Sequence, residues 1–151
     1  MTVPHDGPRG AVTTHGAPGL YDGVPYAYSA HASAPGALLF TAGACPIDAD
    51  GTLVGPGDVR AQTEHVLANL VVALEAGGSS FADVVKTTVF VATTDRADLL
   101  AVWEVFHTFS GGHPAPSTLL GVTVLGWPGQ LVEIEAVAVA GTGPAAAARA
   151  H

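Results

Sequence analysis

Two glutamates, Glu133 and Glu135, have the types and spacing that most clearly suggest chemistry, because they stand two positions apart in the segment 131–139. In an extended strand, side chains two positions apart point to one face, and the apolar residues between them point to the other. The apolar set would pack against helices, so the glutamates would lie on the opposite face. Carboxylates in such a place can act as general acids or bases, or they can be solvated surface groups, and the pattern alone leaves both open.

The other catalytic or metal-binding patterns in the sequence are incomplete. The run Asp-Ala-Asp-Gly at 48–51 begins like a calcium loop, but the EF-hand pattern requires Gly at its sixth position and an acid at its twelfth, where Leu53 and Val59 stand. The seven histidines lack close pairing, so we expect no metal site. The single cysteine, Cys45, could face a cleft, but a nucleophilic thiol needs a base beside it, and no histidine is paired with it.

The charge of the chain argues against nucleic-acid and membrane partners. Five Lys and Arg residues stand against thirteen Asp and Glu, for a formal net charge of −8. Two of the cations lie near the termini, which leaves Arg60, Lys86 and Arg96 for the body, too few for a basic stripe. Because nucleic acids and anionic membranes are bound mainly through Lys and Arg, we expect neither as a partner. The sequence shows no signal peptide and no apolar run of membrane length, so we expect a cytoplasmic protein.

The chain divides into a body at 21–140 and two segments without a periodic pattern. Residues 1–20, rich in Gly, Pro and Thr, predict a flexible N-terminal arm, and residues 141–151 predict a loose C-terminal tail. The chain is 48% hydrophobic and only 12% charged. This composition is consistent with apolar surface buried between subunits, and equally with a codon bias toward Ala, Gly and Val.

Two segments of the body have the apolar spacing of amphipathic helices. They are 58–76 and 95–110, and each is followed by a pair of glycines that would end it. Asp58 is the expected N-cap of the first helix, and Thr94 or Asp95 that of the second.

Five segments have the composition of strands, namely 26–32, 37–41, 84–92, 118–125 and 131–139. We expect the first two to pair through a Pro-Gly turn, and the last two to form a hairpin through another. The predicted order is β-β-α-β-α-β-β, an α+β fold with a mixed sheet. Two helices cannot cover both faces of such a sheet, so we expect both helices on one face and partner subunits on the other.

The order and spacing of several segments resemble the Rid family, the reactive-intermediate deaminases, also called YjgF-type and often labelled endoribonuclease L-PSP. The segments that carry the resemblance are Pro25-Tyr26, LLFTAGACPIDADG (38–51), ANLVVALEAGGSSFADVVKTTVFV (68–91), VWEVFHTFSGGHPAPSTLLGV (102–122) and LVEIEAVAV (131–139). The resemblance implies a homotrimer with a chorismate-mutase-like fold, in which three sheets pack into a central β-barrel. It also implies a small-molecule cleft at each subunit interface, and an activity that uses no metal or organic cofactor.

Carried over to this chain, the resemblance implies roles for particular residues. Tyr26 matches a tyrosine that lines the cleft, and Gly43 matches a glycine whose backbone faces the substrate, with Ala42 in place of a serine. Glu133 matches the glutamate linked to water or to proton transfer. Trp103 stands where many members have an asparagine.

The chain departs from the family pattern at Ser117. The family segment Pro-Ala-Arg-Ser/Thr reads Pro-Ala-Pro-Ser-Thr here, and aligned on 118–122, Ser117 occupies the place of the arginine. An arginine binds a substrate carboxylate through a bidentate, charge-assisted fork that serine cannot form, so standard 2-imino acids are not the expected substrates. Backbone amides near Gly43 and Leu119 would polarise the substrate, and Cys45 would also line the cleft.

The resemblance therefore implies an enamine or imine hydrolase, or a related small-molecule enzyme, that acts at intersubunit clefts. The alternative is a non-catalytic trimer with a binding or regulatory role, which has kept the small-molecule cleft and lost the reaction. A ribonuclease, which one family label suggests, conflicts with the net charge of −8.

Overall fold

The computed structural model describes residues 7–9, 12–21, 23, 26–32, 37–113 and 115–140. The expected C-terminal tail at 141–151 lies outside the described residues. The described helices are α1 (Val59–Ala76) and α2 (Arg96–Phe109), with the short 3₁₀ helix η1 (Phe81–Asp83) between them. The described strands are β1 (Gly7–Arg9), β2 (Val12–His15), β3 (Ser29–Ala32), β4 (Leu38–Phe40), β5 (Val84–Ala92), β6 (Ser117–Val122) and β7 (Val132–Val139).

Helices α1 and α2 begin where the sequence predicts. Asp58 Oδ1 accepts hydrogen bonds from the backbone N–H groups of Arg60 and Ala61 at 3.0 Å each, and Asp95 Oδ1 accepts from that of Ala97 at 2.8 Å. Such caps contribute about 0.5–2 kcal/mol because they satisfy donors that lack a partner in the first turn. The cap of α1 is confirmed, and that of α2 is Asp95. Within the described residues, neither helix has both the length and the apolarity needed to cross a membrane.

The larger sheet is mixed and has the strand order β4-β7-β5-β6. Strand β7 runs antiparallel to β4 and β5, whereas β6 runs parallel to β5 and reaches it through α2. The predicted hairpin between 118–125 and 131–139 is therefore wrong, because β6 pairs with β5, with Thr87 opposite Ser117. A parallel pair needs a crossover connection, and α2 supplies it while covering the sheet. Strand β7 instead fills the place between β4 and β5.

The smaller sheet is antiparallel, with the order β1-β2-β3. The predicted pairing of 26–32 with 37–41 is wrong, because β3 pairs with β2, and β4 pairs with β7. Strands β1 and β2 come from the expected N-terminal arm. Burial alternates along β2, and Val12 packs against Val139 at the end of β7. Ala30 and Ala32 of β3 pack against these two residues, so the arm supplies β3 with an apolar partner.

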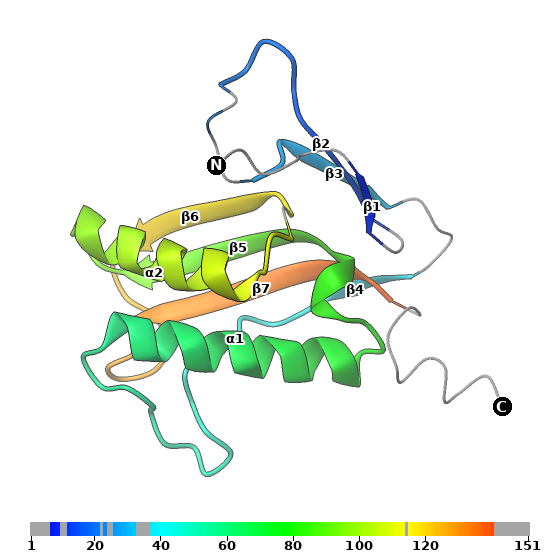
Figure 1. The fold of residues 1–151 in the computed structure, drawn as a ribbon. Coiled ribbons are helices and arrows are strands. Elements are labelled where there is room, and N and C mark those ends of the chain that lie inside the picture. The colour runs from blue at the N-terminus through cyan, green and yellow to red at the C-terminus, as the bar shows by residue number, and fades with distance from the viewer. Residues whose placement is uncertain are drawn as a thin grey trace, which may run out of the picture.

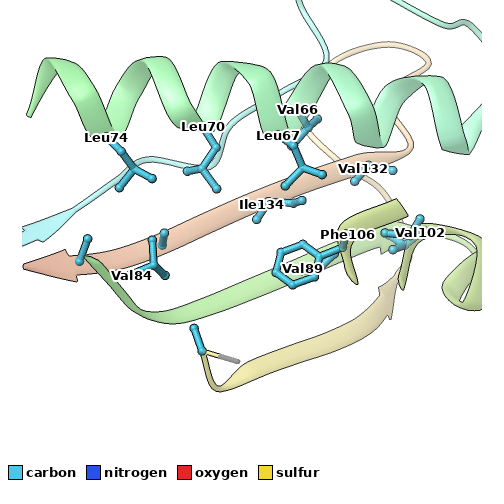
Figure 2. Packing of buried hydrophobic residues seen from close by; sticks show 14 residues of the cluster. Val66, Leu67, Leu70, Leu74, Val84, Val89, Val102, Phe106, Val132 and Ile134 are labelled. Atoms are coloured by element: carbon cyan, nitrogen blue, oxygen red, sulfur yellow. The ribbon is translucent and has the colours of Figure 1, made fainter. Parts of the chain in front are cut away.

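The hydrophobic core lies between the helices and one face of the larger sheet (Figure 2). Leu67, Leu70 and Leu74 project from α1 toward the sheet, whose strand β7 contributes Val132 and Ile134, and all five are fully buried. Burial of one such side chain contributes roughly 1.5–3 kcal/mol. Both α1 and α2 lie on this side of the sheet (Figure 1).

Strand β7 sends alternate residues into the core. Val132, Ile134 and Ala136 are buried there, and Glu133 and Glu135 between them are only partly buried. The glutamates therefore lie on the face away from the helices, as their spacing predicts.

Candidate functional site

The carboxylate of Glu133 is held by the side chain of Gln130, which is only 4% exposed. Gln130 Nε2 donates a hydrogen bond to Glu133 Oε2 at 2.9 Å and lies 3.1 Å from the carbonyl oxygen of Val132. Gln130 Oε1 accepts from the backbone N–H of Trp127 at 3.1 Å. Since the amide is bonded through both its oxygen and its nitrogen, it presents a fixed donor to the glutamate.

Gly43 leaves room for this carboxylate. Its neighbour Ala44 exchanges backbone hydrogen bonds with Ile134, at 2.8 Å from the Ala44 N–H and 3.2 Å from the Ile134 N–H, which brings this segment alongside β7. A Cβ atom on Gly43 would overlap Glu133 Oε1 and would stand 2.5 Å from Cδ. The glutamate side chain therefore packs directly on the Gly43 backbone, and no larger residue fits at this position without a shift.

Cys45 completes the cluster around Glu133. Its Sγ lies 3.6 Å from Glu133 Oε2 and 3.6 Å from the carbonyl oxygen of Gly43. Burial raises the pKa of the Cys45 thiol, and the charge of Glu133 and the hydrogen bond to it raise this pKa further, while Gln130 and Trp127 act in the opposite direction. A protonated thiol is a poor nucleophile, so the surroundings suit Cys45 as a hydrogen-bond donor to Glu133.

Glu135 shares the face of Glu133 but lies in different surroundings. With Lys86 it lines a small hollow of about 100 Å³. Lys86 Nζ donates to the carbonyl oxygen of Thr87 at 2.8 Å and to Thr118 Oγ1 at 2.6 Å. Burial lowers the pKa of Lys86, and the charge of Glu135 acts against this shift. Glu135 is thus a counter-charge for Lys86.

The other predicted residues meet in a second place, on the helix-covered side of the sheet. A pocket of about 280 Å³ is lined by Tyr26, Leu100, Trp103, Ser117 and Leu119, of which Leu100 was not predicted. The rings of Tyr26 and Trp103 meet edge to face, with centroids 6.1 Å apart and planes at 90°. The pocket combines aromatic and aliphatic walls with one hydroxyl group.

The hydroxyl of Ser117 is engaged by the protein itself. Ser117 Oγ donates to the carbonyl oxygen of Ala115 at 3.1 Å and lies 2.6 Å from Thr87 Oγ1. Either hydroxyl can be the donor between Thr87 and Ser117, so the proton of Ser117 is directed to one of two protein acceptors, the carbonyl oxygen of Ala115 or Thr87 Oγ1. Ser117 therefore presents a remaining lone pair, an acceptor, to the pocket.

The two groups of residues do not meet within one chain. Ser117 shares its face with the buried Thr87, and Glu133 lies on the other face of the sheet, two strands away across β5. The structure thus brings Glu133, Gly43 and Cys45 together, and separately joins the residues of the pocket.

Two residues that position the Glu133 cluster were not predicted from the sequence. Gln130 lies two residues before β7 begins, and a polar residue just ahead of an apolar strand is a signal that could have identified it. Asn69 of α1 donates to the carbonyl oxygens of Cys45 and Ile47, at 2.8 and 2.9 Å, and so ties this segment to the helix. Nothing in the local pattern marks Asn69. Among the described residues, no group of three or more His, Cys, Asp or Glu is placed to hold a metal ion.

Two known proteins are similar to this chain over most of its length. Protein DfrA of Myxococcus xanthus is 39% identical over 117 residues, which cover 76% of this chain and 85% of that protein. A RutC family protein of Pyrococcus horikoshii is 37% identical over 103 residues, covering 68% of this chain and 79% of that protein.

Two solved structures are also similar to this chain. The crystal structure of the Rid family protein YyfB from Yersinia pestis is 33% identical, with a TM-score of 0.78, and the match covers 85% of this chain and 98% of that one. E. coli TdcF, solved with bound serine, is 31% identical, with a TM-score of 0.59, and the match covers 83% of this chain and 92% of that one. The family described as Endoribonuclease L-PSP matches residues 24–140 of this chain. The chain therefore belongs to this family, which is also named Rid, YjgF and RutC.

Proposed function

We propose that the protein is a Rid-type deaminase that hydrolyses the carbon–nitrogen double bond of an imine or enamine to a carbonyl compound and ammonia. The observation that carries the proposal is the carboxylate of Glu133, held by Gln130 and packed on the Gly43 backbone, in a chain of this family. General acid–base catalysis requires a proton-accepting group in one fixed orientation.

In this reaction Glu133 would take a proton from a water molecule as the water oxygen bonds to the imine carbon, giving a carbinolamine. The same carboxyl group would return the proton to the nitrogen. The hydroxyl proton of the carbinolamine then passes through Glu133 to the nitrogen, the carbon–nitrogen bond breaks, ammonia leaves and the carbonyl group forms. Water is the only co-reactant and no electrons are transferred, so the chemistry calls for no metal or organic cofactor.

The proposed site lies between the subunits of a homotrimer built around a central β-barrel. The separation of Glu133 from Ser117 on opposite faces supports this assembly, because one subunit would supply the glutamate and its neighbour the pocket. Leu38 and Phe40 on β4 are 53% and 69% exposed, and apolar surface of this kind favours burial against a partner. Light scattering during size-exclusion chromatography measures the assembly, and a monomer at micromolar concentration would sink this part of the proposal.

Standard 2-imino acids are not the proposed substrates. Ser117 stands where the resemblance places an arginine, and the described residues that line the pocket beside it include no positively charged one. The serine bound to the relative TdcF supports a small-molecule site in this fold. In this chain, a substrate carboxylate would lack its cationic partner and would approach the like charge of Glu133.

The test is the hydrolysis of imines that amine oxidases and amino acid oxidases generate in the assay. The reaction is measured as the decrease in the imine that semicarbazide traps. We expect the protein to accelerate hydrolysis of at least one imine, and Glu133→Gln to reduce the acceleration about 100-fold or more. Glu135→Gln, on the same strand and the same face, is the matched control and should change the rate by less than about threefold. An unaccelerated set of imines, or full activity of Glu133→Gln, would refute the proposal.

The alternative is a trimer that binds a small molecule without turnover. The observation that favours it is that no charged residue is found among the described residues that line the pocket. Metabolites that raise the melting temperature while no imine is hydrolysed would support this reading. A ribonuclease is the weakest of the three, because the net charge is −8.

A further inference from the structure

The pocket beside Ser117 has a composition that specifies a class of compound. We infer that the substrate is an imine formed from a primary amine, which carries an apolar or aromatic group and no carboxylate. This inference rests on the proposed function, since it names the compound that the same site would hydrolyse. The apolar group would lie among Tyr26, Leu100, Trp103 and Leu119.

The walls of the pocket are apolar and are fixed in place. Leu100 and Leu119 provide aliphatic surface, and Tyr26 and Trp103 form an aromatic corner with planes at 90°. The Trp103 ring also stacks on that of Phe106, with centroids 5.3 Å apart and an angle of 21°, and Phe106 is part of the core. A rigid corner in a pocket of about 280 Å³ suits one ring or one branched chain.

None of the three cations of the described body is among the lining residues of the pocket. Arg60 pairs with Glu104 between the helices. Lys86 donates to Thr118, on the opposite face of the sheet from Ser117. Arg96 begins α2 and is not among the lining residues, although it is the cation nearest to the pocket along that helix. Within one chain, a carboxylate in the pocket would therefore have no cationic partner among the lining residues to offset its desolvation.

Ser117 and Glu133 favour the opposite charge. The proton of Ser117 is directed to a protein acceptor, the carbonyl oxygen of Ala115 or Thr87 Oγ1, so the serine offers an acceptor rather than a donor. A carboxylate accepts hydrogen bonds and needs donors, whereas the N–H of a protonated imine donates. The carboxylate of Glu133, supplied by the neighbouring subunit, attracts a protonated imine and repels a carboxylate.

Two imines that share one aromatic group test the inference. An amine oxidase acting on phenethylamine and an amino acid oxidase acting on phenylalanine produce imines that differ in the carboxylate. Each is hydrolysed by water alone, to an aldehyde or a keto acid and ammonia, and semicarbazide trapping measures the imine that remains. We expect kcat/KM to be about tenfold or more higher for the imine from phenethylamine.

The outcomes separate this inference from the proposed function. An equal or faster reaction of the imine from phenylalanine overturns the substrate class and leaves the deaminase proposal intact. Failure to accelerate either imine, with other imines accelerated, overturns the substrate class alone. If no imine at all is accelerated, both fall.

Variants of the pocket provide a second test. Ser117→Arg and Leu100→Lys each add a cation, and both should raise kcat/KM for the imine from phenylalanine relative to that from phenethylamine. Leu100 is largely exposed, so its substitution should preserve the fold even if Ser117→Arg does not. An unchanged ratio in the folded Leu100→Lys trimer counts against the assignment. Arg96→Gln should leave the ratio unchanged, and a changed ratio would show that Arg96 is a carboxylate anchor.

The aromatic corner is tested by Trp103→Leu, which keeps an apolar side chain. We expect KM for the imine from phenethylamine to rise about tenfold with little change in kcat, because binding area is lost and the acid–base group is untouched. Phe109→Ala, on the same helix but outside the pocket, is the control and should leave KM unchanged. Equal KM values for Trp103→Leu and the wild type would overturn the assignment of this pocket.

Discussion

Gln130 Nε2 donates a hydrogen bond to Glu133 Oε2 at 2.9 Å, and the same nitrogen lies 3.1 Å from the carbonyl oxygen of Val132. The other end of the Gln130 amide accepts from the backbone N–H of Trp127. A buried amide bonded in this way cannot rotate without breaking several hydrogen bonds at once. The connection before β7 therefore decides how the glutamate on that strand points.

Gln130→Leu removes the donor to Glu133 while preserving most of the side-chain volume. We expect kcat on an accepted imine to fall about tenfold or more and KM to change by less than about threefold, because Gln130 orients the acid–base group and does not touch the substrate. Steady-state kinetics measure both constants. Gln130→Asn, which keeps the amide on a shorter arm, should recover part of kcat. If Gln130→Leu retains full kcat, Gln130 does not position Glu133.

Gly43→Ala places a Cβ atom where Glu133 Oε1 lies. The glutamate must then leave the Gly43 backbone, so we expect a loss of activity about as large as that of Glu133→Gln. Gly126→Ala is the matched control, because a Cβ atom there meets nothing within 4 Å. Hydrolysis rates and melting temperatures of the two variants provide the comparison. An active Gly43→Ala protein would show that the close approach of Gly43 and Glu133 is not needed.

The pKa of the Cys45 thiol is raised by burial and by Glu133. We expect its alkylation by iodoacetamide to rise with pH at higher values in the native protein than in the protein unfolded in urea. Since the folded pKa is the higher one, the thiol stabilises the fold below the pKa of the unfolded state, and this contribution is lost as the pH rises through the folded pKa. Glu133→Gln should move the native alkylation profile toward that of the unfolded protein. Superimposed profiles of native wild type and Glu133→Gln would refute the coupling.

Leu70→Ala tests the core that holds β7. Leu70 is fully buried between α1 and the sheet, so we expect the free energy of unfolding to fall by about 2–5 kcal/mol. Val72→Ala, on the same helix but 65% exposed, should change it by about 0.5 kcal/mol or less. Urea titrations at one fixed protein concentration measure both, because binding between subunits makes the apparent stability depend on concentration. Equal effects of the two substitutions would contradict this placement of the core.

Local patterns predicted those parts of the fold that depend on local physics. The period of the apolar residues identified α1 and α2, Asp58 was the expected cap of α1 and Thr94 or Asp95 that of α2, and alternation along β7 placed Glu133 on the face away from the helices. Strand pairing was not predictable in this way. A turn of Pro and Gly before β7 indicated a hairpin with β6, but β6 pairs in parallel with β5, through a crossover that α2 provides.

The candidate site was predictable only in part, for a related reason. Glu133, Gly43 and Cys45 are brought together by backbone pairing between segments far apart in the chain. Spacing indicated Glu133, and resemblance to a family then singled out Glu133 and Gly43. The place of Cys45 just after Gly43 suggested that it could face the cleft. Gln130 acts through a side-chain hydrogen bond across three residues, which no periodic pattern records. The apolar alternation along β7 indicates the face on which Glu133 lies. It does not indicate the face of Ser117, which belongs to β6 and lies on the other side of the sheet.

Strand β7 comes last among the described strands, yet it lies inside the larger sheet, between β4 and β5. During synthesis β4 has no partner in that sheet until β7 has left the ribosome, and Leu38 must then find Val139 across nearly the whole body of the chain. Closing so long a loop is slow, and the apolar side of α1 stays partly uncovered meanwhile. Nascent chains that stop before residue 132 should therefore depend on chaperones and be prone to aggregation.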